Sequence, residues 1–199
     1  MIRPVRSLLH GLTDPSQAVE ASALGLDGAV IALAGSGEPD LELDLPAAVR
    51  VAAALPPLAA RIAQLAPGAA LPAPFGVAVT RGAAPRPPGA AVHLVRLTWE
   101  EFEAGRMPAA DGLWLRPRAG ASATATGFEW SSVAAAAARV RLVLEIPDGA
   151  DGVETAVRLG HPYAVAFAEA AWFRPGIVDL DRLESALAAV ARLNKAAFS

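Results

Sequence analysis

The chain has 199 residues, of which 54% are hydrophobic and 19% charged, and this is enough to bury the core of one domain spanning residues 1–199. Its formal net charge of −3 weighs against nucleic acid as a partner, and the absence of cysteine excludes disulfides and thiolate metal sites. We expect no resident metal, no cofactor and no membrane association. The lack of cysteine is compatible with a cytoplasmic location, which we also expect.

Strand and helix signals alternate along the chain, and this order predicts an α/β fold with a parallel sheet. The first unit is a strand at 5–10 followed by a helix from Pro15 to about Gly25. Asp14 is suited to cap that helix, and Gln17 stands at the capping-box position. A second strand at 29–33 and a second helix at 45–55 follow.

Residues 56–90 are rich in proline, glycine and alanine and carry little helical periodicity. We expect strands at 60–66 and 75–80, a loop at 81–90, and helices that are shortened or missing on this side of the fold. The regular order then returns, with predicted strands at 92–97, 112–116, 142–145 and 163–168.

Three helix signals mark the second half of the chain. Thr98 and Glu101 form a predicted capping box, and Asp151 with Glu154 is predicted to cap a helix that ends at Gly160. The last helix carries Leu183, Leu187 and Val190 on one face, as expected for packing against a core.

Two stretches of the chain resemble phosphoribosylanthranilate isomerase, the small (βα)8 barrel of tryptophan biosynthesis. Residues 8–15 read LLHGLTDP, where that family usually has K-I-C-G-L-T. Residues 162–165 and 175–179 read PYAV and PGIVD, where the family has P-Y-A-V and P-G-V-K-D. The resemblance extends over about residues 5–55 and 91–192. It implies a single TIM-type (βα)8 barrel, irregular around 56–90.

The family resemblance places the catalytic positions on residues that differ from the family's own. The family uses a cysteine at the end of the first strand as the base, and His10 stands there. Histidine can also act as a base near neutral pH. The family uses an aspartate at the end of the sixth strand as the acid, and Arg116 stands there. A guanidinium with a pKa above about 12 should fail as a general acid.

The binding positions that the resemblance implies are altered as well. Glu42 is nearest to the family's carboxylate-binding arginine. The glycine-rich phosphate loops of the family are replaced by Glu145-Ile146-Pro147-Asp148, Ala168-Glu169-Ala170-Ala171-Trp172 and Ser122-Ala123-Thr124-Ala125. Glycine lets backbone N–H groups approach a phosphate, whereas proline removes a donor and carboxylates repel the anion.

The resemblance gathers a mixed-charge set at the barrel mouth, made up of His10, Arg96, Arg116, Glu145 and Glu169. We favour internal salt bridges that plug the mouth. The competing interpretation is a new site for a small polar or zwitterionic ligand, on which Trp172 and Phe173 would stack. Those two aromatic residues are equally compatible with a cover over the opening or with a partner surface. We expect His93 to be a packing residue and His161 to lie at the opposite end.

Three functional hypotheses follow. The first is a diverged relative that lacks the Amadori-type isomerase activity and is either repurposed or non-catalytic. The second is a working intramolecular aldose–ketose isomerase with His10 as its base. The third is a scaffold or interaction protein, either a monomer or a homodimer.

Overall fold

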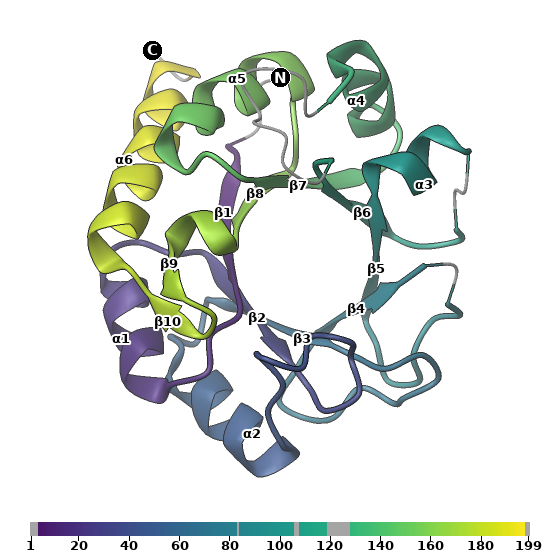
Figure 1. Ribbon diagram of the computed structural model, residues 1–199, viewed down its shortest axis with the longest axis vertical. Coiled ribbons are helices and arrows are strands. Elements are labelled where there is room, and N and C mark those ends of the chain that lie inside the picture. The colour runs from purple at the N-terminus through teal and green to yellow at the C-terminus, as the bar shows by residue number, and fades with distance from the viewer. Residues whose placement is uncertain (1–3, 83, 106–107, 119–127, 198–199) are drawn as a thin grey trace.

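The computed structural model describes residues 4–82, 84–105, 108–118 and 128–197. Eight parallel strands form a closed barrel in which each strand pairs with the next and β8 pairs with β1 (Figure 1). The strands are β1 Arg6–His10, β2 Gly28–Ala32, β3 Ala60–Gln64, β4 Val77–Arg81, β5 Val92–Thr98, β6 Gly112–Arg116, β7 Arg141–Ile146 and β8 Ala164–Phe167. The predicted TIM-type barrel is therefore confirmed, with all eight strands present.

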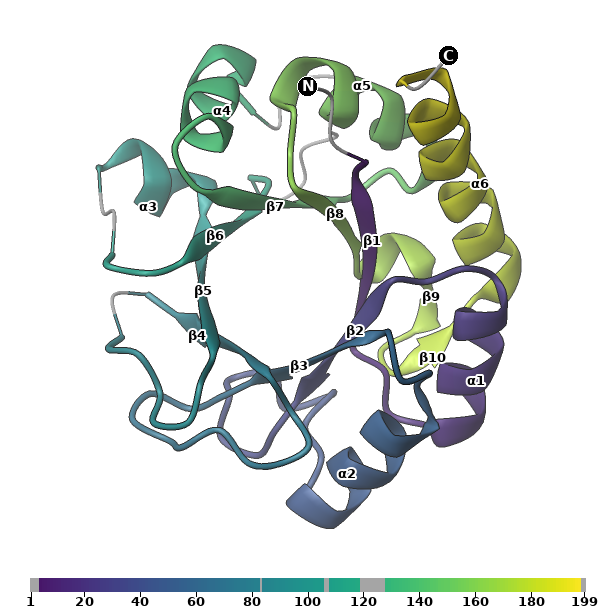
Figure 2. The same ribbon diagram turned by 180° about the vertical axis from the view of Figure 1, so that it is seen from behind.

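Helices cover the outside of the barrel unevenly. They are α1 Pro15–Ala23, α2 Leu45–Ala54, α3 Trp99–Glu103, α4 Trp130–Ala137, α5 Ala150–Gly160 and α6 Leu180–Ala197. In the described parts of the connections from β3 to β5, residues 65–76, 82 and 84–91, no helix forms, and loops take the place of two helices (Figure 2). This confirms the expected irregularity around residues 56–90, and the barrel nevertheless closes.

Some of the helix caps predicted from the sequence form in the structure, and others do not. Asp14 accepts a hydrogen bond from the Ser16 backbone N–H, and Thr98 with Glu101 forms the predicted capping box. Two expectations are wrong. Gln17 does not complete a box but accepts from the Val178 N–H at 3.3 Å, which ties α1 to the C-terminal segment. Asp151 does not cap α5, because the helix starts at Ala150, so that Asp151 is its second residue and Gly149 is the N-cap.

Two apolar layers hold the barrel together. Outward-facing strand residues pack against the helices, including Leu183, Leu187 and Val190 of α6, which are buried as expected. Inward-facing residues fill the barrel interior: Leu8, Val30, Ile62, Val79, Leu94, Trp114, Val143, Ala164 and Ala166. The interior is therefore a packed core rather than a pore, so any site must lie at an end of the barrel.

The chain after β8 forms a cover beside the carboxyl ends of the strands. A 3₁₀ turn, η1 (Glu169–Ala171), leads into an antiparallel pair, β9 (Trp172–Arg174) and β10 (Ile177–Val178). None of the helices in the described residues is long and apolar enough to cross a membrane.

Candidate functional site

Four buried polar side chains form a layer at the carboxyl end of the barrel. They stand near the ends of the odd-numbered strands: His10 on β1, Gln64 on β3, Arg96 on β5 and Glu145 on β7. Each lies two residues after an inward-facing apolar residue of the same strand, and alternation along a strand therefore turns it inward as well. All four are at most 6% exposed. Polar groups at this depth are costly unless they are paired.

Hydrogen bonds join the four side chains in sequence across the barrel. His10 Nε2 lies 2.9 Å from Gln64 Oε1, Arg96 Nη1 lies 3.3 Å from the same oxygen, and Arg96 Nη2 lies 2.7 Å from Glu145 Oε2. The other end of the Gln64 amide, Nε2, donates to the Ser36 carbonyl at 3.4 Å. The layer is therefore one connected network.

This network determines which His10 nitrogen carries the proton. Arg96 can only donate and the Ser36 carbonyl can only accept, so the Gln64 oxygen must face Arg96 and His10. Since that oxygen accepts, His10 Nε2 must be the protonated nitrogen. His10 Nδ1 is then an acceptor in the neutral ring, and it has no hydrogen-bond partner.

Burial keeps His10 neutral. Its removal from water, together with the nearby Arg96 cation, lowers the pKa of His10 to about 4, although Glu145 acts in the opposite direction. The imidazole is therefore uncharged near pH 7 and is a weak base there.

Glu145 is the most heavily bonded carboxylate of the mouth. Besides Arg96, it accepts from Trp114 Nε1 at 3.0 Å and from Arg116 Nε at 3.2 Å. Burial opposes its charge, but Arg96 and Arg116 outweigh burial and lower the pKa of Glu145 to about 2. The expected salt bridges therefore form between Glu145 and the two arginines. The expectation that they plug the mouth is wrong, because a cavity remains above them.

A loop after β2 brings in a second carboxylate. Glu38 pairs with Arg96 at 2.5 Å and also with Arg81 at the end of β4. Burial opposes the charge of Glu38, and Arg96 and Arg81 outweigh it, so its pKa is lowered. Glu42, at the predicted substrate-arginine position, instead accepts backbone N–H bonds from Gly35, Gly37 and Glu38, and it holds this loop in shape.

Trp172 forms a wall of the site and is not a free surface residue. Its Nε1 donates to the His10 carbonyl at 3.0 Å, and its ring stacks on the His10 ring at 6.2 Å between centroids. Gly11 makes this approach possible, because a Cβ there would lie 2.5 Å from the Trp172 ring. Phe173 also borders the site but is 76% exposed, so it is better suited than Trp172 to a partner surface.

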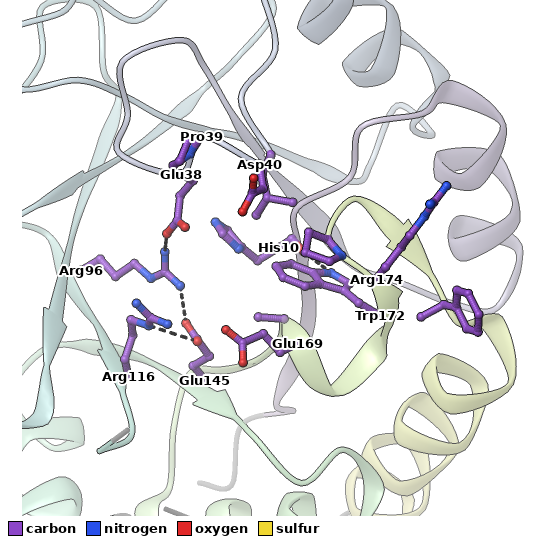
Figure 3. A pocket seen from close by; sticks show the side chains of 14 residues that line it. His10, Glu38, Pro39, Asp40, Arg96, Arg116, Glu145, Glu169, Trp172 and Arg174 are labelled. Atoms are coloured by element: carbon purple, nitrogen blue, oxygen red, sulfur yellow. Dashed lines mark hydrogen bonds and ion pairs between the residues drawn. The ribbon is translucent and has the colours of Figure 1, made fainter. Parts of the chain in front are cut away.

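These groups enclose a cavity of about 390 Å³ above the polar layer (Figure 3). In the figure Asp40 and Glu169 point into it, whereas Arg174 turns away. The six site residues predicted from sequence all line this one cavity: His10, Arg96, Arg116, Glu145, Glu169 and Trp172.

The structure adds residues that the sequence reasoning missed. Glu38 and Asp40 reach the cavity from a loop, and Gln64 joins the layer beneath it. Gln64 carries a usable signal, because Ala60, Ile62 and Gln64 alternate on one face of β3 and a glutamine follows two apolar residues. No comparable periodicity marks the loop residues Glu38 and Asp40.

The altered phosphate loops lie partly outside this cavity. Pro147 and Asp148 border a separate hollow together with Asp151 and Asp181, and Glu169 stands between the two hollows. The third altered loop, 122–125, lies outside the described residues. Within the described part of the chain, no group of three or more histidine, aspartate or glutamate residues is arranged to hold a metal ion.

The other two histidines lie away from the mouth. His93 faces outward from β5, is fully buried, and its Nε2 lies 2.8 Å from Thr80 Oγ1. Its burial and this hydrogen bond agree with the expected packing role. His161 follows α5, at the opposite end of the barrel, as expected.

Solved structures with the same fold include phosphoribosylanthranilate isomerases. The enzyme from Thermus thermophilus aligns with 22% identity and a TM-score of 0.71, covering 95% of this chain and 100% of that one. The enzyme from Thermotoga maritima aligns with 18% identity and a TM-score of 0.70, covering 94% and 99%. Thiamine phosphate pyrophosphorylase from Pyrococcus furiosus also aligns, with 11% identity and a TM-score of 0.66, covering 96% of each chain.

The likeness is therefore one of fold. No protein-family profile matches the chain, and a search of curated proteins finds no match. Because one fold can host unrelated reactions, function has to be argued from the residues at the mouth.

Proposed function

We propose that this protein is an isomerase-like barrel that does not carry out the phosphoribosylanthranilate isomerase reaction and instead uses its mouth to bind a small polar molecule. The observation that carries the proposal is the cation at the end of β6, where the resemblance expects a proton donor. Arg116 occupies that position and its Nε is bonded to Glu145. A guanidinium does not release a proton near pH 7.

The base position supports the same conclusion. The pKa of His10, lowered to about 4 by burial and by Arg96, is far from the value near the working pH that favours proton transfer. Its Nε2 is engaged by Gln64, so only Nδ1 is available as an acceptor. His10 can accept a hydrogen bond there, but it is a poor group for removing a proton.

Electrostatics at the mouth oppose a phosphate ester. One neighbouring structure was solved with a reduced carboxyphenylamino-deoxyribulose 5-phosphate bound, a ligand with a doubly charged group. In this chain Glu145 and Glu169 line the cavity. A carboxylate about 5 Å from one phosphate charge costs on the order of 3 kcal/mol at an effective dielectric constant near 20. Arg96 and Arg116 are paired with Glu145, so the repulsion comes mainly from the unpaired carboxylate of Glu169.

The test is a direct assay. The purified protein would be offered phosphoribosylanthranilate, with the Thermotoga maritima enzyme as a positive control, and its gene would be tested for rescue of a tryptophan auxotroph that lacks the isomerase. We expect neither turnover nor rescue. Turnover that His10→Ala abolishes would defeat the proposal and favour an active isomerase with His10 as its base.

A further inference from the structure

The cavity at the mouth is surrounded by polar atoms that lack partners. His10 Nδ1 is buried and unpaired. Asp40 and Glu169 are exposed at the rim, and within the described part of the chain no hydrogen bond or ion pair engages their carboxylates. Arg116 is bonded only through Nε, so its two terminal nitrogens are left over. Such groups are satisfied by a ligand or by water.

These atoms divide by chemical role. His10 Nδ1 must accept, since the network assigns the ring proton to Nε2. The two unpaired carboxylates also accept. The unpaired donors are the two terminal nitrogens of Arg116 and the buried Nε of Arg96. A ligand that satisfies all of them needs a positively charged donor for the acceptors and an anionic group for Arg116.

The charge balance points the same way. Four carboxylates line the cavity, namely Glu38, Asp40, Glu145 and Glu169. Arg81, Arg96 and Arg116 face or pair with them, and Arg174 also lines the cavity, although its side chain turns away (Figure 3). Four guanidiniums therefore balance four carboxylates, and the mouth has no excess of positive charge. A ligand that carries both signs of charge suits it better than a dianion does.

We propose that the cavity binds a small zwitterionic amine of the amino-acid class, and this rests on the proposed function above. Its carboxylate would pair with the free nitrogens of Arg116. Its ammonium groups would lie among Glu169, Asp40 and His10 Nδ1, beside the ring of Trp172, whose face also attracts cations. A cavity of about 390 Å³ is within the range of ordinary small-molecule sites.

Titration calorimetry with L-lysine tests this assignment. The comparison compounds are cadaverine, which is lysine without its carboxylate, glutarate, which lacks an ammonium group, and ribose 5-phosphate. We expect saturable lysine binding that is at least about tenfold tighter than binding of any of the three, since each lacks one charge-assisted contact or adds a repulsive one. No lysine binding at millimolar concentration, or tighter binding of the phosphate ester, would overturn the assignment.

Two substitutions at the rim of the mouth locate the ligand. Arg116→Gln should weaken lysine about tenfold and should not weaken cadaverine, whereas Glu169→Gln should weaken both. Glu154→Gln, which changes an exposed carboxylate on α5 outside the mouth, is the matched control and should change neither. If neither mouth substitution changes the affinity for lysine, the assignment is overturned.

A second readout does not depend on the variants. Addition of lysine should shift the ¹⁵N resonance of His10 Nδ1, because a donor would arrive at a bare nitrogen, and an unshifted resonance at saturation would contradict the placement. The two proposals fail separately. Isomerase turnover would defeat the proposed function whatever lysine does, whereas absent lysine binding without turnover would defeat only this inference.

Discussion

Two buried layers of side chains lie inside the barrel, two residues apart on the same four strands. One is apolar and the other is a hydrogen-bonded network of polar and charged groups. The lower layer consists of Leu8, Ile62, Leu94 and Val143, and the upper layer consists of His10, Gln64, Arg96 and Glu145. Backbone geometry is the same in both, since each pair lies on one face of one strand. The side chains alone decide whether the layer fills space or forms a charged network.

The difference has an energetic consequence. Apolar contacts add up from many small contributions, so the cost of truncating one side chain grows with the cavity that it leaves. A buried polar network is stable only when every member has a partner. Removing one side chain leaves the others charged or unpaired where water cannot solvate them. The upper layer is therefore weak evidence for stability and strong evidence for a specified arrangement of charge.

The largest effect should come from Glu145→Gln. This change keeps the shape of the side chain and removes its charge, so Arg96 and Arg116 lose their shared partner. We expect unfolding in urea to show a loss of about 3–5 kcal/mol, as for other buried pairs broken on one side. Glu154→Gln removes an exposed partner of Arg158 and should cost less than about 0.5 kcal/mol. A loss at Glu145 as small as at Glu154 would show that the network is solvated and not a buried layer.

A somewhat smaller loss is expected from Leu94→Ala in the layer below. Leu94 is 6% exposed in the barrel interior, and truncation leaves a cavity that the surrounding strands fill only partly. The loss in the free energy of unfolding should be about 3 kcal/mol. It should be the same at pH 7 and pH 5.5, because no titrating group is removed. A loss that changes with pH would mean that the two layers are coupled and that the comparison between them is too simple.

Much of this layering could be predicted from sequence. Several strands are apolar runs with a polar residue at the mouth. The runs ending in His10 and Arg116 and the run at 142–145 predicted both the strand and its polar end. The loss of helices around residues 56–90 was also predictable, since that stretch lacks helical periodicity and is broken by prolines.

The pairing within the mouth was less predictable. Arg96 and Glu145 are 49 residues apart, and the network also needs Glu38, whose position depends on three backbone N–H bonds to Glu42. A loop of this kind carries no repeating pattern. The same limit explains Gln17, which bonds to Val178 in a distant segment where the local pattern predicted a capping box.

The smallest expected effect is a dependence of the free energy of unfolding on pH. It distinguishes the two layers directly, because only the upper layer contains titratable side chains. The pKa of His10 is lowered to about 4 in the folded protein, against about 6.5 for a free histidine. Between these values the unfolded chain binds a proton that the folded chain does not. Stability therefore falls as pH drops below 6.5, and His10 should account for about 1 kcal/mol between pH 7 and pH 5.5. Glu145 acts in the same direction only below its ordinary value of 4.5, because its pKa is lowered to about 2.

One other histidine must be separated from this effect. Burial, with Arg86, lowers the pKa of His93, which therefore contributes a fall of the same sign. His10→Asn should reduce the slope of unfolding free energy against pH but not abolish it. If His10→Asn leaves the slope intact, the imidazole is reached by water in the folded protein, and the upper layer would then be a solvated rim, not the buried counterpart of the apolar layer beneath it.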